Sequence, residues 1–260
     1  MMKRLKAGIV QFDVVVGDMD RNLSVVQQRI RSLAGQGVGM VVLPEMWSCG
    51  FANDRLDLFA RSTPDILQIL KILSKGQGIT IIGSLPEAAD GGIYNTAFVV
   101  DRGDVCARYR KVHLFTPTRE DRYFTSGREA VVASTSLGMI GLMICYDLRF
   151  PELSRILALQ GAWIIVVMAQ WPAARVFHWD ILLKARAIEN QVFVVGANRS
   201  GRDQELAYGG HSRIISPYGE VLGRASKRSG TIRATIDPDT LVQAREQIPC
   251  LEQRVPKAYI

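Results

Sequence analysis

At residues 141–152 the sequence reads Gly141-Leu142-Met143-Ile144-Cys145-Tyr146-Asp147-Leu148-Arg149-Phe150-Pro151-Glu152. Its first half is an apolar run too short for a helix, which predicts a strand buried on both faces. Pro151 suits the first turn of a helix, so we expect Cys145 between a buried strand and a helix. A helix N-terminus favours negative charge, and the thiolate is the reactive form of cysteine, so the position suits a nucleophile. A small buried core cysteine is the alternative that this segment leaves open.

Outside this segment, strands and helices alternate along most of the chain. Short apolar runs predict strands over residues 6–11, 38–43, 79–83, 94–100, 105–110, 130–134, 139–144, 163–168, 192–197, 208–215 and 232–236. Apolar residues at helical spacing predict helices over 18–34, from Thr63-Pro64-Asp65 onward, and over 151–160, 177–188 and 238–247. Doubly buried strands that alternate with helices predict an α/β fold. Because no linker or tandem repeat interrupts the pattern, we expect one domain over residues 1–260.

The composition is typical of a globular protein. Of the 260 residues, 48% are hydrophobic and 22% are charged, and no apolar run is long enough to cross a bilayer. The net charge of +7 would suit an anionic partner, but no block of five Lys and Arg residues occurs. We therefore expect no nucleic-acid partner and no membrane partner. The N-terminal residues lack the apolar core and cleavage site of a signal peptide, which predicts a cytoplasmic protein.

The cysteines and histidines show no metal-binding pattern. The four cysteines contain no Cys-x-x-Cys pair, and the three histidines have no zinc-ligand spacing. We therefore expect no metal site. Histidine is the usual partner of a nucleophilic cysteine, and His113 lies two residues beyond Lys111. His113 is thus a less favoured candidate for a catalytic base, and a structural role is the simpler interpretation.

Three of the expected strands are followed by a reactive side chain. Glu45 follows strand 38–43, Lys111 follows strand 105–110, and Cys145 follows strand 139–144. Ligands in open α/β sheets collect beyond the carboxyl ends of strands, so the three groups can meet there. A carboxylate can take the thiol proton, an ammonium and the Tyr146 N–H can hold an oxyanion, and the cysteine can form an acyl-enzyme. Taken singly, Glu45 is better explained as a polar strand end that meets water, and Lys111 as a solvated charge in a basic turn.

At these three points the sequence resembles the nitrilase, or carbon–nitrogen hydrolase, superfamily. The matching segments lie in the family's order and at its usual separations. They are VVLPEMW at 41–47, YRKVHLF at 109–115 and ICYDLRFPE at 144–152, with LKARAIEN at 183–190 similar to the family's helix after the nucleophile. Three motifs in register, with a matching pattern over essentially the whole chain, make this resemblance specific.

The resemblance implies a fold and a set of catalytic residues. It implies a Glu-Lys-Cys triad of Glu45, Lys111 and Cys145, and a second glutamate in the loop after the lysine. Glu120 matches that second position better than Glu129 does. The family fold is a four-layer α-β-β-α sandwich, with two mixed sheets packed face to face and helices outside. Its subunits usually pair, so a homodimer or higher homo-oligomer is implied, and no cofactor is required.

Residues 169–175 (AQWPAAR), followed by His178-Trp179, resemble the ω-amidase branch of the superfamily. That branch hydrolyses the terminal amide of short 2-oxo dicarboxylic acid monoamides, such as 2-oxoglutaramate and 2-oxosuccinamate, and releases ammonia. Because a guanidinium binds a carboxylate as a bidentate fork, Arg175 is our candidate contact to the substrate carboxylate. An ordinary surface arginine is an almost equal alternative for Arg175. The aromatic residues expected to wall the pocket are Trp47, Phe51 and Trp171.

The same triad leaves two other classes of function open. Among enzymes, it could serve an N-carbamoyl amino acid, a nitrile or another aliphatic amide. The non-enzymatic alternative is a binding or regulatory relative with a silent site, and the intact triad argues against it.

Overall fold

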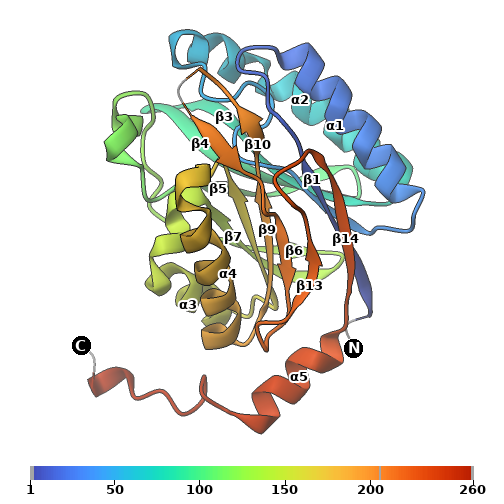
Figure 1. The fold of residues 1–260 in the computed structure, drawn as a ribbon, viewed down its shortest axis with the longest axis vertical. Helices are drawn as coiled ribbons and strands as arrows, with labels where there is room; N and C mark the ends of the chain where they lie inside the picture. The colour runs from blue at the N-terminus through green and yellow to red at the C-terminus, as the bar shows by residue number, and fades with distance from the viewer. Residues whose placement is uncertain (1–2, 205, 259–260) are drawn as a thin grey trace.

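Two six-stranded β-sheets lie face to face, and a pair of helices covers the outer face of each sheet (Figure 1). The structure is a computed structural model and is described for residues 3–204 and 206–258. The layers follow the order helix, sheet, sheet, helix. The predicted four-layer α-β-β-α sandwich with two mixed sheets is therefore confirmed.

The first sheet contains the strands β1 (Leu5–Gln11), β2 (Met40–Val42), β3 (Thr80–Ala89), β4 (Gly92–Asp101), β5 (Asp104–Arg110) and β14 (Gly230–Ile236). Their spatial order is β14-β1-β2-β3-β4-β5. Helix α1 (Met19–Ala34) connects β1 to β2, and helix α2 (Leu56–Gln77) lies between β2 and β3, so these three strands are parallel. Short turns join β3, β4 and β5, which are antiparallel.

The second sheet contains the strands β6 (Val132–Thr135), β7 (Gly138–Ile144), β8 (Ile164–Ala169), β9 (Phe193–Asn198), β12 (Arg213–Ile215) and β13 (Val221–Arg224). Their order is β13-β12-β9-β8-β7-β6. Helices α3 (Pro151–Leu159) and α4 (Val176–Asn190) make the crossovers of the parallel strands β7, β8 and β9. Both sheets thus contain parallel strands whose carboxyl ends carry loops.

Three smaller elements complete the described chain. Strands β10 (Ser200–Arg202) and β11 (Ala207–Gly209) form a separate two-stranded ribbon. Helix α5 (Pro238–Gln247) follows β14 and leads the C-terminal segment away from the sandwich, at the bottom of the view (Figure 1). Among the described residues, no helix is both long enough and apolar enough to cross a membrane.

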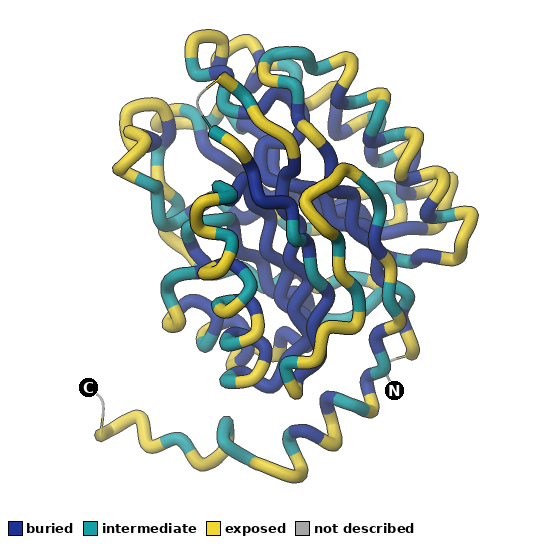
Figure 2. Tube along the Cα trace, viewed as in Figure 1, coloured by how far each residue is buried: buried dark blue, intermediate teal, exposed yellow. Residues whose placement is uncertain are grey.

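The core occupies the space between the sheets and beneath the helices, where the trace is almost entirely buried (Figure 2). The sheets meet where β1 contacts β9, β4 contacts β7 and β5 contacts β6. Helix α1 begins at an Asp18 cap, whose carboxylate accepts the Arg21 N–H at 3.1 Å. At Gly196 on β9, an added Cβ would lie 2.7 Å from the Leu183 side chain, so glycine allows α4 to pack closely.

Two prolines lie inside elements that we expected them to bound. Pro64 was expected at the start of a helix, and Pro86 after the end of a strand. Helix α2 begins at Leu56 and continues through Pro64, whereas we expected a helix start at Thr63. Its first two turns bury an apolar face, and that burial outweighs the one hydrogen bond that Pro64 cannot donate. Strand β3 likewise runs past Pro86, which pairs only with β4, because β2 ends before that point.

The expected strand 208–215 is also divided. Gly210 and His211 have positive φ, and the chain turns there between β11 and β12. Strand β13 was not predicted, because Val221 and Leu222 lie at an exposed sheet edge with little apolar pattern around them.

Candidate active site

The three predicted catalytic side chains lie together at one end of the sandwich. Glu45 follows β2 and Lys111 follows β5 in the first sheet, and Cys145 follows β7 in the second. The Lys111 Nζ atom donates to Glu45 Oε1 at 2.8 Å, and both side chains are almost completely buried. Cys145 is half-buried and faces the same cavity as the other two. The structure therefore brings the predicted carboxylate, ammonium and thiol into one site.

Glu120 is the fourth predicted residue, and it lies beside Lys111. The Lys111 Nζ atom donates to both carboxylate oxygens of Glu120, at 2.8 and 2.9 Å. Glu120 also accepts the backbone N–H of Phe115 at 2.7 Å, which closes the loop between the two residues. The ammonium thus lies between two buried carboxylates, those of Glu45 and Glu120. The alternative Glu129 does not line the cavity.

Cys145 has an unusual backbone conformation. Its φ is +49°, a region that L-residues other than glycine rarely adopt, and it begins the short 3₁₀ turn Cys145–Arg149. As expected, a turn follows Cys145, and helix α3 begins at Pro151. The first N–H groups of a helical turn have no partner inside it, and this applies to the Tyr146 N–H next to the thiol.

Asp147 holds this turn in place. Its Oδ2 atom accepts the Ile144 N–H at 2.8 Å and the Tyr109 hydroxyl at 2.7 Å. Its Oδ1 atom accepts the His113 N–H at 3.1 Å and lies 2.8 Å from His113 Nδ1. One buried carboxylate therefore ties the nucleophile turn to the strand and loop that carry Lys111.

Replacing Asp147 with alanine should lower the free energy of unfolding by at least about 3 kcal/mol, because several buried donors would lose their acceptor at about 1–3 kcal/mol each. Urea unfolding measures the change. Asp104→Ala is the matched control, because Asp104 is exposed and forms only a long surface ion pair with Lys71. Equal stability of the two variants would contradict the role assigned to Asp147.

The electrostatics of the site favour an uncharged thiol at rest. Burial raises the pKa of Cys145 well above its usual value, and the charge of Glu45 raises it further. Burial also raises the pKa of Glu45, although the Lys111 ammonium opposes that shift. Burial alone would lower the pKa of Lys111, but the Glu45 and Glu120 carboxylates outweigh burial and the pKa is raised well above its usual value. A thiolate therefore forms most readily when its proton passes to a nearby base.

Two further residues, which sequence reasoning missed, hold the Glu45 carboxylate. Asn95 on β4 donates its side-chain amide to Glu45 Oε1 at 2.9 Å, and the backbone N–H of Gln170 donates to Oε2 at 3.0 Å. The Oε1 atom therefore accepts from both Lys111 and Asn95, whereas Oε2 accepts one described hydrogen bond and retains a lone pair. The signals for both residues were present: Gln170 follows a buried strand, and Asn95 is polar within one.

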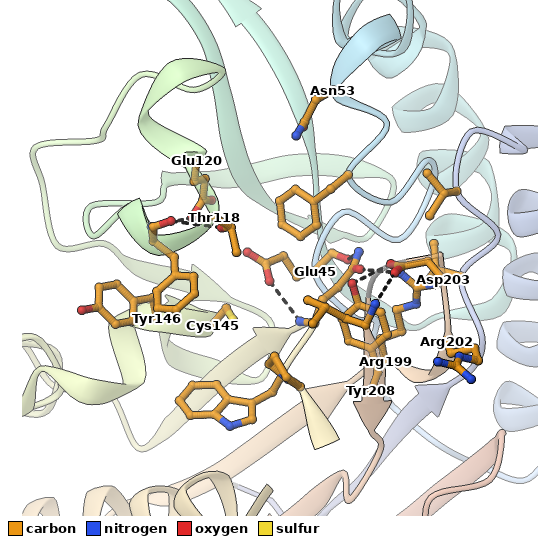
Figure 3. Close-up of a pocket in the computed structure, with 18 of the residues that line it drawn as sticks. Glu45, Asn53, Thr118, Glu120, Cys145, Tyr146, Arg199, Arg202, Asp203 and Tyr208 are labelled. Atoms are coloured by element: carbon orange, nitrogen blue, oxygen red, sulfur yellow. Dashed lines mark hydrogen bonds and ion pairs between the residues drawn. The ribbon is translucent and has the colours of Figure 1, made fainter. Parts of the chain in front are cut away.

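The side chains of Glu45, Lys111, Glu120 and Cys145 line a cavity of about 800 Å³. Tyr146, Phe51, Trp171 and Arg175, all predicted from the sequence, line it. In Figure 3, Cys145 and Tyr146 lie on one side of Glu45, while Arg199, Asp203 and Tyr208 lie on the other. The volume is ample for a small amide.

Two guanidinium groups stand over aromatic rings on the cavity wall. Arg175 lies 5.6 Å above the Phe115 ring, and Arg149, which we did not predict, lies 4.8 Å above the Trp171 ring. Both side chains line the cavity, so either can meet an anionic group of a ligand there.

Trp47 lies elsewhere than predicted. It does not line the cavity and packs in the core beneath α1 and α2, where it is completely buried. An added Cβ at Gly83 would come within 2.8 Å of the Trp47 indole nitrogen, so the ring fills the space above β3. Trp47 lies only two residues after Glu45, but the chain turns between them at Met46, where φ is +46°.

The histidines are outside the catalytic cluster. His113 is bound to Asp147 and stacks on Phe150 with ring centres 3.6 Å apart, which supports a structural role over a base. His211 is paired with Asp180 at 2.9 Å. Within residues 3–204 and 206–258, no group of three or more His, Cys, Asp or Glu side chains is placed to hold a metal ion.

Comparison with known proteins identifies relatives over nearly the whole chain. The "Hydrolase in agr operon" of Staphylococcus lugdunensis is 40% identical over 87% of this chain and 99% of its own length. The 2-oxoglutaramate amidase of Bacillus subtilis is 35% identical over 94% of this chain and 95% of its own length. Among solved structures, Saccharomyces cerevisiae Nit3, a member of the nitrilase superfamily, superposes with a TM-score of 0.90, at 27% identity and 97% coverage of each chain.

The sequence profile of the carbon–nitrogen hydrolase family matches residues 6–246. This match and the identities above confirm the predicted superfamily and the predicted enzyme class, a hydrolase of carbon–nitrogen bonds such as those of amides. The treatment of residues 1–260 as a single domain stays a prediction. The chain belongs to the carbon–nitrogen hydrolase family.

Proposed function

We propose that this protein is a thiol amidase in which Glu45, Lys111 and Cys145 carry the chemistry and Glu120 supports them. The observation that carries the proposal is the cluster itself: the Cys145 thiol shares a cavity with the Glu45 carboxylate, whose Oε2 atom retains a lone pair. Glu45 is bonded to an ammonium that is itself shared with Glu120. A base, an oxyanion donor and a nucleophile are the parts that acyl transfer needs.

The reaction proceeds in two halves. Glu45 takes the thiol proton while Cys145 Sγ attacks the amide carbonyl carbon, and the oxygen of the tetrahedral intermediate is held by Lys111 Nζ and the Tyr146 N–H. The carbon–nitrogen bond breaks as Glu45 passes its proton to the nitrogen. Ammonia departs, and the acyl group remains on Cys145 as a thioester. Glu45 then takes a proton from water, whose oxygen attacks the thioester. The carboxylic acid leaves, and the proton on Glu45 returns to the sulfur.

We infer further that the substrate is a small amide with a distant carboxylate, with 2-oxoglutaramate and 2-oxosuccinamate as the leading candidates. A relative that covers 94% of this chain is a 2-oxoglutaramate amidase. Arg175 supplies a cation on the cavity wall, with the aromatic walls Phe51, Trp171 and Tyr146 beside it. The decisive assay compares ammonia release from 2-oxoglutaramate, an N-carbamoyl amino acid, a simple nitrile and propionamide.

If Arg175 binds the substrate carboxylate, Arg175→Met should raise KM for 2-oxoglutaramate about 10- to 100-fold, because a charge-assisted hydrogen bond contributes about 1.5–3 kcal/mol. The KM for propionamide, which has no carboxylate, should not change. Arg61→Met on the exposed face of α2 is the matched control. An equal rise in KM for both substrates would show that Arg175 does not bind the substrate carboxylate. Arg149 would then be the remaining candidate.

Two alternatives are decided by the same assays. Faster turnover of the N-carbamoyl compound or the nitrile would keep the triad chemistry and change the substrate class. No turnover, with a Cys145 that iodoacetamide does not label, would indicate a silent binding relative. A homo-oligomer and a cytoplasmic location stay predictions, which light scattering and cell fractionation test.

A further inference from the structure

We propose that Arg199 is a positioning residue for the Glu45 carboxylate, and that it acts through the side chain of Gln170. This inference rests on the proposed role of Glu45 as the base. Arg199 follows β9 and is 1% exposed, and it is the most deeply buried charged side chain among the described residues of the segment 199–204, which contains β10. It extends the catalytic cluster to a residue outside the three motifs of the family resemblance.

Arg199 is held from three directions. Its Nη1 atom donates to Asp203 Oδ2 at 3.1 Å, and its Nη2 atom lies 3.5 Å from Asp13 Oδ1, in the loop after β1. The guanidinium carbon lies 4.1 Å from the centre of the Tyr208 ring, on β11 (Figure 3). Its own backbone N–H donates to the carbonyl of Ala169, the last residue of β8. These contacts hold the guanidinium in one orientation, so it can fix the position of a side chain that it binds.

Gln170 connects the Arg199 guanidinium to Glu45, the proposed base. Its side-chain carbonyl accepts Arg199 Nη1 at 2.8 Å, and this leaves its amide nitrogen directed at the Glu45 backbone carbonyl, which it reaches at 2.9 Å. The Gln170 backbone N–H then meets Glu45 Oε2 at 3.0 Å. Gln170 therefore grips Glu45 at both its main chain and its carboxylate, and Arg199 fixes which way the Gln170 amide faces.

The oxygen held in this way is the one that matters for proton transfer. Lys111 and Asn95 occupy Oε1, so Oε2 is the oxygen left to accept the thiol proton. Its distance and angle to the sulfur depend on Gln170. A displacement of about 1 Å of a reacting group can cost about 100-fold in rate, so loosening this contact should lower kcat.

Two other roles for Arg199 make different predictions. Arg199 lines the cavity, so it could bind the substrate, and its loss would then raise KM. It could also serve only to tie the segment 199–204 to Asp13, and its loss would then lower the melting temperature alone. A double-mutant cycle with Gln170 distinguishes these roles from positioning, because two residues that act as one unit are not additive.

The experiment uses Arg199→Met, Gln170→Met and the double variant, assayed with the amide that the wild type hydrolyses fastest. Each single variant should lower kcat about 10- to 100-fold with little change in KM. The kcat of the double variant should lie within about 3-fold of the kcat of the less active single variant. If the two residues acted independently, the two reductions in kcat would multiply instead. Arg199→Lys keeps the positive charge but loses the bidentate geometry of the guanidinium, so its kcat should lie between those of wild type and Arg199→Met. If Arg199→Met does not fold, Arg199→Lys and Gln170→Met give the same cycle.

A pH profile separates positioning from simple loss of structure. The Gln170 N–H lowers the pKa of Glu45, so a looser contact should move the acidic limb of kcat/KM to higher pH. The other titratable groups that face Glu45 are Lys111, Glu120, Cys145 and Tyr208, and none is substituted in these variants. Because Arg199→Met also removes a charge next to Tyr208, Gln170→Met is the variant whose pH profile tests positioning alone.

Controls fix the interpretation of each result. Arg213→Met removes an equally partnered arginine, 3.2 Å from Asp180 and away from the cavity, and should lower stability without changing kcat or the pH profile. A rise in KM with additive effects, or a lower melting temperature with normal kcat, would overturn the proposal. Glu45→Gln tests the chemistry itself: full turnover in that variant would refute the proposed mechanism, whatever Arg199 does.

Discussion

Replacement of Cys145 with alanine should reduce amide hydrolysis by at least about 10⁴-fold, because loss of the nucleophile of a covalent mechanism removes the whole acyl-enzyme route. The fold should tolerate the change. Cys145 is half-buried, contacts the core only in part, and follows the end of β7 rather than lying within it. Ammonia release measures the first effect, and thermal unfolding measures the second. In wild type, mass spectrometry of a rapidly quenched reaction should show a thioester on the peptide that contains Cys145.

Cys106→Ala is the control, because Cys106 is an exposed free thiol on β5 and does not line the cavity. It should leave turnover unchanged. Substantial turnover in the Cys145 variant would contradict covalent catalysis. If the activity disappears together with a large loss of thermal stability, the cysteine would instead be a structural residue.

Replacement of Lys111 with methionine should have the second large effect, on stability as well as on activity. Lys111 is the ammonium between the buried carboxylates of Glu45 and Glu120. Removing one partner of a buried ion pair leaves an uncompensated charge, which costs about 3–5 kcal/mol. Turnover should also be lost, since the oxyanion loses its charged donor. Urea unfolding at several pH values measures the stability change.

The pH dependence of that variant has a definite sign. Without the ammonium, burial and repulsion from the Glu120 carboxylate raise the pKa of Glu45 in the folded state further above its unfolded value. Groups with a raised folded pKa contribute stability at low pH and lose it as the pH rises through that pKa. The deficit relative to wild type should therefore be smaller at pH 5 than at pH 8. Lys71→Met, which removes an exposed lysine on α2, should show no such trend, and a deficit independent of pH would contradict the buried-pair account.

The α/β class was predictable from the sequence pattern because several strands are continuous apolar runs, whereas the four-layer sandwich was implied by the family resemblance. Strands β7, β8 and β9 are buried on both faces, and this gave them a clear pattern. Local rules failed where tertiary packing overrides them. Pro64 lies within α2 because the turns before it bury Leu56 and Phe59 in a cluster with loop residues such as Met46 and Phe124, and the residues next to Pro64 do not reveal those distant contacts.

The active site was predictable to the extent that its residues follow strands. Glu45, Lys111 and Cys145 each come directly after a buried or paired strand, and the family motifs then brought them together. The same rule would have pointed to Gln170 after β8 and Arg199 after β9, but neither belongs to a recognised motif. Trp47 was misplaced for a different reason. It is close to Glu45 along the chain, but the positive φ of Met46 turns the chain between them and directs Trp47 into the core.

One property of the sandwich bears on how the enzyme is built. Glu45 and Lys111 come from one sheet, while Cys145, Gln170 and Arg199 come from the other. The proposed reacting atoms are thus brought together where the two sheets meet, and neither sheet carries all of them. A sideways slip of one sheet over the other by a fraction of a strand repeat would separate sulfur from carboxylate while every strand and helix stayed intact. Catalytic rate is therefore a more sensitive gauge of alignment between the sheets than any measure of secondary structure.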